Sequence, residues 1–226
     1  MAFLHGTSAR FYYHTLDFSA YTEGVALEMG NDLAEFRPLS GSSVRRVPGQ
    51  RTCRISLSGT VMDSDTHAAA WSALSDTSER VWAMLPAGDA VGGVAICGIG
   101  FSDTQQRVAG DDIVRLPITF LSSDDFDVCK ILRNLSSGGT SPSALVNMGA
   151  AGGNGGRAYL LATEISSTLT VTVQHSDNGT DWSDLVVMSS LNTPGSEMKE
   201  VSGTVNRYLR VSWTGSGTWF LAFYQA

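Results

Sequence analysis

The stretch Leu169-Thr-Val-Thr-Val-Gln-His-Ser-Asp-Asn-Gly179 joins a strand pattern to a turn signal. Its apolar residues, Leu169, Val171 and Val173, alternate with threonine and glutamine, which is the period-2 pattern of a half-buried β-strand. The closing Asn178-Gly179 pair is the strongest short-range signal for a β-hairpin, because both residues adopt the left-handed turn conformation at low cost. The stretch therefore predicts a strand that turns back on itself, and a mainly β fold.

The remainder of the C-terminal third continues this pattern. Trp182 and residues 185–188 belong to the predicted return strand, and Tyr208–Trp213 alternates polar with apolar side chains again. Thr214-Gly-Ser-Gly217 predicts a turn, and Trp219–Tyr224 a closing strand. Several short strands separated by turn residues are typical of a small β-sandwich.

The N-terminal part of the chain carries further strand signals. They lie at Cys53–Val61, Val81–Leu85, Val94–Ile99 and Ile113–Leu121. Pro117 interrupts the last of these, and because proline has no N–H to donate, it places that strand at a sheet edge or at a bulge.

One helix is predicted, at about residues 64–75. Asp63, Ser64 and Asp65 supply capping oxygens and negative charge at its N-terminus. Ala68-Ala-Ala-Trp-Ser-Ala-Leu74 has high helix propensity. The first domain is therefore predicted to be β with a single packed helix.

The chain changes composition between these two parts. Ser136-Ser-Gly-Gly-Thr-Ser-Pro-Ser143 is followed closely by Gly149-Ala-Ala-Gly-Gly-Asn-Gly-Gly156. Ordering glycine and serine at this density costs entropy that buried side chains do not repay. The sequence predicts a domain at residues 1–136, a linker at 137–156 and a small β-sandwich domain at 157–226.

The segment 31–50 shows no sustained periodicity and is predicted to be a long loop. A loop of about 20 residues in a compact domain is uncommon unless it has a function. The segment and its border contain Arg37, Arg45, Arg46 and Arg51, and arginine forms bidentate contacts with carboxylates. Two interpretations remain open: a subunit interface, or a solvated loop without a partner.

The charge excludes one class of function. The net charge is −7, whereas a protein that grips nucleic acid needs a basic face to displace counterions. The three cysteines, Cys53, Cys97 and Cys129, are widely spaced and are predicted to be reduced core residues. The N-terminal residues lack the pattern of a signal peptide and no stretch approaches the ~18 apolar residues of a membrane span, so we expect a soluble protein made in the cytoplasm.

The sequence contains no recognisable catalytic or metal-binding motif. There is no GxSxG, and no histidine or cysteine pair has HxxxH, HExxH or CxxC spacing. The aspartate groups near residues 63, 111 and 124 lack the glycine and distal glutamate of an EF-hand. We expect no catalytic residue, no metal ion, no cofactor and no enzymatic activity.

Three tryptophans of the C-terminal part, Trp182, Trp213 and Trp219, could form a platform for a sugar ring. Tryptophans on strands more often fill a core. The core interpretation is favoured, and the platform stays open as the alternative.

Two stretches resemble the major tail protein of long-tailed bacteriophages. The first is Gly49-Gln-Arg-Thr-Cys-Arg-Ile-Ser-Leu-Ser-Gly-Thr-Val-Met-Asp63, where an alternating strand follows Pro-Gly. The second is Thr170–Leu185 with Val201–Val211, which is similar to the additional β-sandwich that such proteins carry. The second match is the more specific.

The resemblance implies a tail-tube subunit. Its first domain would be a β-sandwich or half-barrel with one helix, forming hexameric rings that stack into a tube through which DNA passes without specific binding. The long loop would be the arm that contacts the next ring, and the second domain would project outward. The implied partners are further copies of the chain, the tape measure protein and the tail terminator, and the implied location is the tail of a virion assembled in the host cytoplasm, with no membrane partner.

One alternative stays open. The chain could instead be a phage or cell-surface binding module whose C-terminal sandwich recognises carbohydrate.

Overall fold

The computed structural model describes residues 8–37, 44–60, 71–72, 74–75, 77–105, 108–109, 114–115, 117–123, 126–136 and 138–226. The named elements of these residues are all strands, which confirms the predicted mainly β fold. Contacts divide the chain into two units. Unit 1 consists of Met1–Tyr21, Glu79–Ile99 and Asp127–Ala226, and unit 2 of Thr22–Ser78 and Gly100–Phe126.

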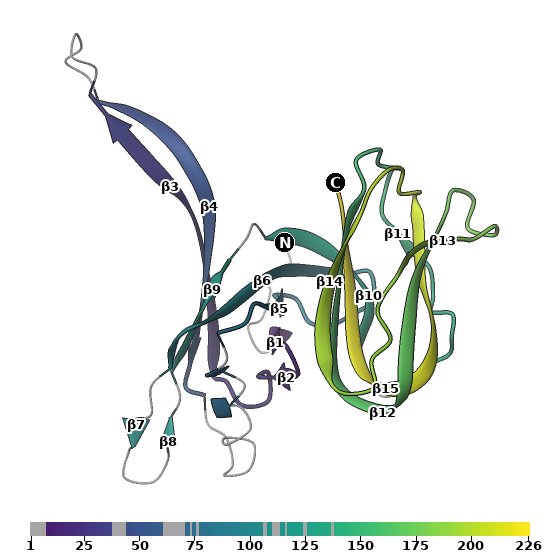
Figure 1. Ribbon diagram of the computed structural model, residues 1–226, viewed down its shortest axis with the longest axis horizontal. Coiled ribbons are helices and arrows are strands. Elements are labelled where there is room, and N and C mark those ends of the chain that lie inside the picture. The colour runs from purple at the N-terminus through teal and green to yellow at the C-terminus, as the bar shows by residue number, and fades with distance from the viewer. Residues whose placement is uncertain are drawn as a thin grey trace. The chain divides into compact units, whose positions relative to one another are not determined.

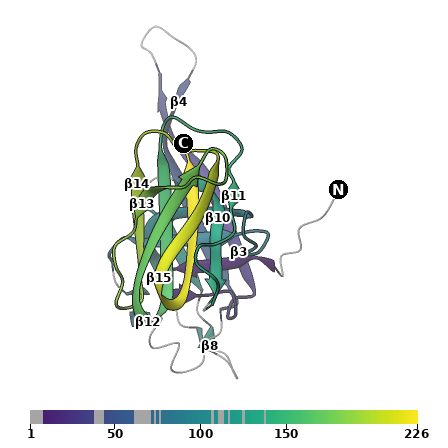
Figure 2. The same ribbon diagram turned by 90° about the vertical axis from the view of Figure 1, so that its right-hand side faces the viewer.

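Unit 1 is built around a sheet in which neighbouring strands follow the order β13-β12-β15-β10-β6-β5-β1-β2 (Figures 1 and 2). In addition, β14 pairs with β12, and β11 with β15. The strands are β1 (Arg10–Tyr13), β2 (Leu16–Asp17), β5 (Arg80–Leu85), β6 (Val94–Gln105), β10 (Asp127–Ser136), β11 (Val146–Asn147), β12 (Gly156–Ser176), β13 (Ser183–Val187), β14 (Gly195–Val201) and β15 (Tyr208–Gln225).

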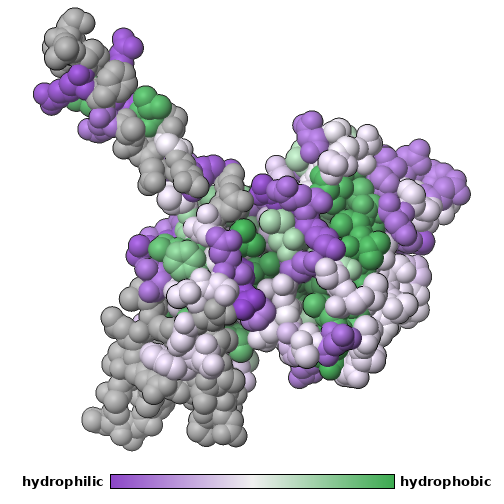
Figure 3. Space-filling model, in the orientation of Figure 1, coloured by the Kyte–Doolittle hydropathy of each residue, from purple (hydrophilic) through white to green (hydrophobic). Residues whose placement is uncertain are grey.

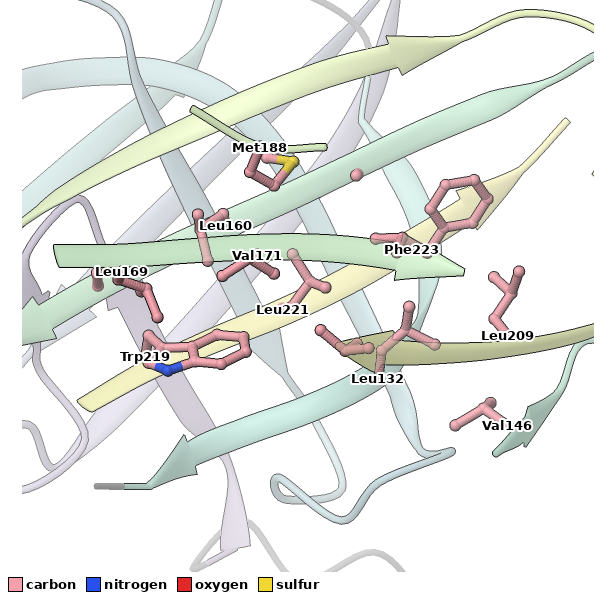
Figure 4. Packing of buried hydrophobic residues seen from close by; sticks show 14 of the residues in the cluster. Leu132, Val146, Leu160, Leu169, Val171, Met188, Leu209, Trp219, Leu221 and Phe223 are labelled. Carbon is pink, nitrogen blue, oxygen red and sulfur yellow. The ribbon is translucent and has the colours of Figure 1, made fainter. Parts of the chain in front are cut away.

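Strands β12 and β15 form a long antiparallel ribbon that folds over on itself. They pair from Gly156 opposite Gln225 to Ser176 opposite Tyr208. Leu160 and Val171 of β12 would lie about 36 Å apart in a straight strand, yet both belong to one hydrophobic cluster. Figure 4 shows their side chains near one another, with Leu221 of β15 alongside. The two halves of the ribbon are therefore the two layers of a sandwich.

One half of this ribbon is buried on both faces. Ala158–Ala162 and Trp219–Phe223 are all at most 1% exposed. Leu160 and Leu221 point into the sandwich core, whereas Tyr159 and Phe220 join a second cluster with residues of β1, β5, β6 and β10. A strand covered on both sides needs a continuous apolar run, which these two segments supply.

The ribbon bends at glycines. Gly215 has a φ of +85°, and a Cβ at Gly217 would lie 2.2 Å from the carbonyl oxygen of Glu164. The register between β12 and β15 shifts three times between Ala162 and Thr170. The prediction of a turn at 214–217 is wrong, because left-handed glycine and these bulges let the chain change direction while the ladder continues.

The glycine- and serine-rich segment is hydrogen-bonded to β15 and to the residues just before it. Val146 pairs with Leu209, Ser143 N donates to Val211 O at 2.8 Å, and Gly152 forms a bridge with Val205. Residues before and after this segment belong to the same unit. This grouping differs from the division at residues 137–156 that composition predicts.

Unit 2 contains β3 (Gly24–Phe36), β4 (Arg45–Ser58), β7 (Val108–Ala109), β8 (Val114–Arg115), β9 (Ile118–Ser122) and the end of β6. β4 pairs with β3 and β9, and β9 also pairs with β6. Its buried side chains include Cys53, Ile55, Leu57 and Phe120. The alternation predicted at Cys53–Val61 is thus present in the inner half of β4. Pro117 lies between β8 and β9 and belongs to neither strand. Because β9 pairs with β4 on one side and with β6 on the other, the proline precedes a strand inside the sheet and not the edge strand that it predicts.

A complete helix at residues 64–75 is not seen. Trp71, Ser72 and Leu74 are helical, and Ser75 N donates to Trp71 O at 3.0 Å, as in a last helical turn. The remaining residues of the predicted helix, 64–70 and 73, lie outside the described part of the chain.

Candidate assembly interface

Strands β3 and β4 form a second long ribbon, in unit 2 (Figure 1). They pair from Gly24 opposite Ser58 to Phe36 opposite Arg45. Strand β9 pairs with β4 only from Arg54 to Leu57. Beyond Cys53, therefore, this ribbon has no third strand among the described residues.

The outer part of the ribbon is exposed on both faces. Every side chain that the structure describes within residues 28–37 and 44–52 is exposed, including the apolar Met29 at 58% and Val47 at 48%. Cys53 is the first buried residue, and burial raises the pKa of its thiol to about 11. In Figure 3 hydrophilic residues, in purple, gather along this ribbon with a few apolar ones between them. An isolated two-stranded hairpin is marginal in water, and its open edges are templates for pairing with another chain.

The ribbon carries a local irregularity. The register shifts between Asn31 opposite Arg51 and Leu33 opposite Pro48. Proline cannot donate a ladder hydrogen bond, so Pro48 with Gly49 is a place where extra backbone is accommodated. The prediction of an irregular loop at 31–50 is wrong: these residues lie mainly in strands. Alternation is absent because neither face is covered, so no face requires apolar residues.

The two strands have opposite charges. β3 carries Glu28, Asp32 and Glu35 and no basic residue, whereas β4 carries four arginines and no acidic residue. The arginines are Arg45, Arg46, Arg51 and Arg54. The ribbon therefore has an acidic strand beside a basic one.

The four arginines predicted for an interface lie together on this ribbon. Arg46 Nε is 2.6 Å from Glu35 Oε1, directly across the ladder. Arg51 lies over the Phe126 ring, with its guanidinium carbon 4.4 Å from the ring centre. Arg37 follows the end of β3, Arg45 begins β4, and both are exposed. The acidic residues of β3 were not predicted, although their separation from the arginines is visible in the sequence at 28–35 and 45–54.

The three tryptophans have different environments in unit 1. Trp219 is fully buried in the sandwich core and presents no ring face to a ligand (Figure 4). Trp182 is half-buried, with the Arg210 guanidinium 4.2 Å from its ring centre. Trp213 is half-buried and meets Trp219 edge to face at 5.4 Å.

Within the described ranges, no three histidine, cysteine or acidic side chains gather as they would around a metal ion. No described helix is long and apolar enough to cross a membrane. The three cysteines are buried and form no disulfide.

No protein-family model matches this sequence, and no curated protein matches it. Among solved structures, a chain from the virion of a native gene transfer agent particle is 14% identical, with a TM-score of 0.43 over 55% of this chain and 97% of that chain. The Dit protein of SPP1, from the hub adsorption apparatus of phages that infect Gram-positive bacteria, is 10% identical. Its TM-score is 0.36 over 95% of this chain and 97% of the Dit chain.

Proposed function

We propose that this protein is a structural subunit of a bacteriophage tail and that its copies join through the β3–β4 ribbon. The observation that carries the proposal is that every described side chain of this ribbon within residues 28–37 and 44–52 is exposed. A ribbon of this length, whose outer part has no third strand among the described residues, gains stability when a partner supplies the missing surface.

A second copy of the chain fits the charges of the ribbon. The arginines of β4 would face the carboxylates of β3 on the neighbouring copy, and the opposite charges would select that arrangement over contacts between like strands. Such a contact joins two different surfaces, so it is heterologous and propagates into a ring or a filament. The apolar Met29 and Val47 would be covered in the same contact.

The sequence resemblance extends the proposal to stacked rings, six subunits to a ring, that form a tube in the virion tail. The tape measure protein and the tail terminator are the partners proposed on the same ground. A net charge of −7 suits a tube through which DNA moves, because acidic walls avoid tight phosphate contacts.

The test uses two charge-reversal variants of the full chain. One carries Arg45→Glu and Arg46→Glu, and the other Glu28→Arg and Glu35→Arg. We expect the parent to form rings or tubes in electron microscopy and in light scattering after size exclusion, and each variant alone to stay small. Mixing the two variants restores the opposite charges at each contact, so the mixture should assemble again.

The control carries Arg115→Glu and Arg207→Glu, which lower the net charge by the same amount as Arg45→Glu with Arg46→Glu, at exposed positions outside the ribbon. It should assemble like the parent. If the ribbon variants assemble as well as this control, the ribbon is not the interface. A parent that stays monomeric at every concentration, with no rings or tubes, contradicts the proposed function itself.

A further inference from the structure

Unit 1 contains a cavity of about 310 Å³ beside Trp213. It is formed by the end of β10, the segment 138–144, Val91 and the Trp213 ring. We infer that this cavity binds a neutral sugar unit that carries an N-acetyl group.

The walls of the cavity are held in place by a buried arginine. Arg133 is 5% exposed, and its Nη2 donates to the carbonyl oxygens of Ser136 and Gly138, at 2.9 Å each. Its Nη1 donates to the carbonyl oxygens of Trp219 and Asn134. The guanidinium carbon lies 3.8 Å from the Trp219 ring centre. The segment that follows β10 is thereby tied to β15.

The same segment is fixed at its far end. Trp213 N donates to Ser141 Oγ at 2.9 Å, and Val211 N donates to Ser143 Oγ at 3.0 Å. A cavity whose walls are already ordered binds a small ligand without a further loss of loop entropy.

The lining indicates a neutral ligand. Among the described residues that line the cavity, Arg133 alone is charged, and the donors on both of its terminal nitrogens already bond backbone carbonyls. Burial lowers the pKa of Arg133 to about 10, so it stays protonated at neutral pH and bound to those carbonyls. A phosphate or carboxylate ligand would find no open donor on these two terminal nitrogens.

The remaining groups suit an acetylated sugar. The half-buried Trp213 ring can stack on the C–H face of a pyranose. The Asn134 amide and the Thr140 hydroxyl line the cavity and have no hydrogen-bond partner among the residues that the structure describes, so they can bond ring hydroxyls or an acetamido group. Val91, Leu132 and Ala144 provide an apolar surface for the acetyl methyl.

The experiment is ligand-detected NMR of the full chain with N-acetylglucosamine and N-acetylgalactosamine, with glucose as the matched sugar that lacks the acetamido group. We expect saturation transfer to the acetyl methyl of at least one acetylated sugar, with a Kd on the order of 1 mM, as is usual for one small ligand. Glucose should bind more weakly. Absence of transfer to both acetylated sugars overturns the inference.

Two variants assign the binding to this cavity. Trp213→Ala and Asn134→Ala should each weaken binding by about two- to tenfold, and Trp182→Ala, elsewhere in unit 1, should leave it unchanged. Near-ultraviolet circular dichroism checks the fold, and Asn134→Ala remains informative if Trp213→Ala destabilises the core. Binding that survives Asn134→Ala, or that is lost in Trp182→Ala, places the sugar elsewhere. Assembly through the ribbon is independent of this outcome.

Discussion

The chain contains two long antiparallel ribbons, one of which is largely buried and the other largely exposed. β12 and β15 fold over on themselves, and one half of their ribbon is buried on both faces. β3 and β4 pair along a similar length, yet their outer part is exposed on both faces. Pairing alone therefore does not decide whether a ribbon becomes core or surface.

The difference comes from side chains and from the residues at the bends. The buried ribbon has continuous apolar runs at Ala158–Ala162 and Trp219–Phe223, with Gly215 and Gly217 where it bends. The exposed ribbon has charged residues on both strands and Pro48 at its irregular position. Apolar runs gain free energy from burial, whereas burying unpaired charges costs it. The first ribbon stabilises its own unit, and the second is free for a partner.

The largest expected difference between the two ribbons is the effect of deleting each of them on folding. A chain that ends at Ser136 loses β12 and β15. β10 then loses one of its two partner strands, and the cluster around Cys129 and Ile131 loses the side chains of Tyr159 and Phe220. We expect this chain to be insoluble or unfolded. Replacing residues 30–51 by an Asn-Gly turn should leave a folded protein, because no described side chain from 30 to 51 is buried.

Soluble expression and near-ultraviolet circular dichroism distinguish these outcomes. A folded, soluble chain ending at Ser136 would instead support the division at 137–156 that composition predicts.

Replacing one apolar residue by alanine in each ribbon compares how much each side chain contributes to the free energy of unfolding. Phe220 is fully buried and packs edge to face on Tyr12 at 5.4 Å, so Phe220→Ala should lower the free energy of unfolding by about 3–5 kcal/mol. Val47→Ala, at 48% exposure in the other ribbon, should change it by less than about 0.5 kcal/mol. Urea titration measures both. Equal losses would show that the β3–β4 ribbon is packed in the monomer.

Arg133→Met tests the segment that follows β10. The substitution leaves the buried carbonyl oxygen of Trp219 and the carbonyl oxygen of Gly138 without the Arg133 donors. We expect the free energy of unfolding to fall by about 2–3 kcal/mol. The same urea titration applies, with Arg45→Met in the exposed ribbon as the matched control. No loss would mean that the segment is not held by Arg133.

The smallest expected difference in the free energy of unfolding is between two polar contacts of equal length, one in each ribbon. Tyr159 Oη donates to the buried Asp127 carboxylate at 2.6 Å, and Arg46 Nε lies 2.6 Å from Glu35 on the exposed ribbon. Tyr159→Phe should lower the free energy of unfolding by about 1–2 kcal/mol. Arg46→Gln should lower it by less than about 1 kcal/mol, because water already solvates both charges. Chemical denaturation of the two variants ranks them, and the reverse order would contradict the burial of Asp127.

Several local features follow from the sequence because they depend on neighbouring residues. The alternation at Leu169–Gln174 lies in β12, and Asn178-Gly179 lies in the turn before β13. Val81–Leu85 is β5 almost to the residue. In contrast, Thr214–Gly217 has turn composition but continues a strand, since the partner strand β12 satisfies its backbone through shifted register. The ribbon at 31–50 has no periodicity and still forms strands, because cross-strand pairing needs no apolar face.

For the predicted interface and platform residues too, the sequence gives the residue types but not their surroundings. The sequence places four arginines near one segment, but the ladder brings Arg46 opposite Glu35 and sets a basic strand against an acidic one. Tryptophan composition cannot separate Trp219, which is buried, from Trp213, which lines a cavity. That distinction depends on which strand covers each ring.

By itself, the sequence determined the β class, the apolar runs, the hairpin turn at Asn178-Gly179 and the clustering of arginine near residues 37–51. These properties are set by side chains a few positions apart. Only the tertiary structure decided that β12 and β15 fold into a sandwich and that residues 141–152 are hydrogen-bonded to β15 and to the residues just before it. It also decided that the outer part of β3 and β4 has no third strand among the described residues. The reason is that burial depends on surfaces distant in the chain, so similar pairing within a ribbon does not determine what packs against it.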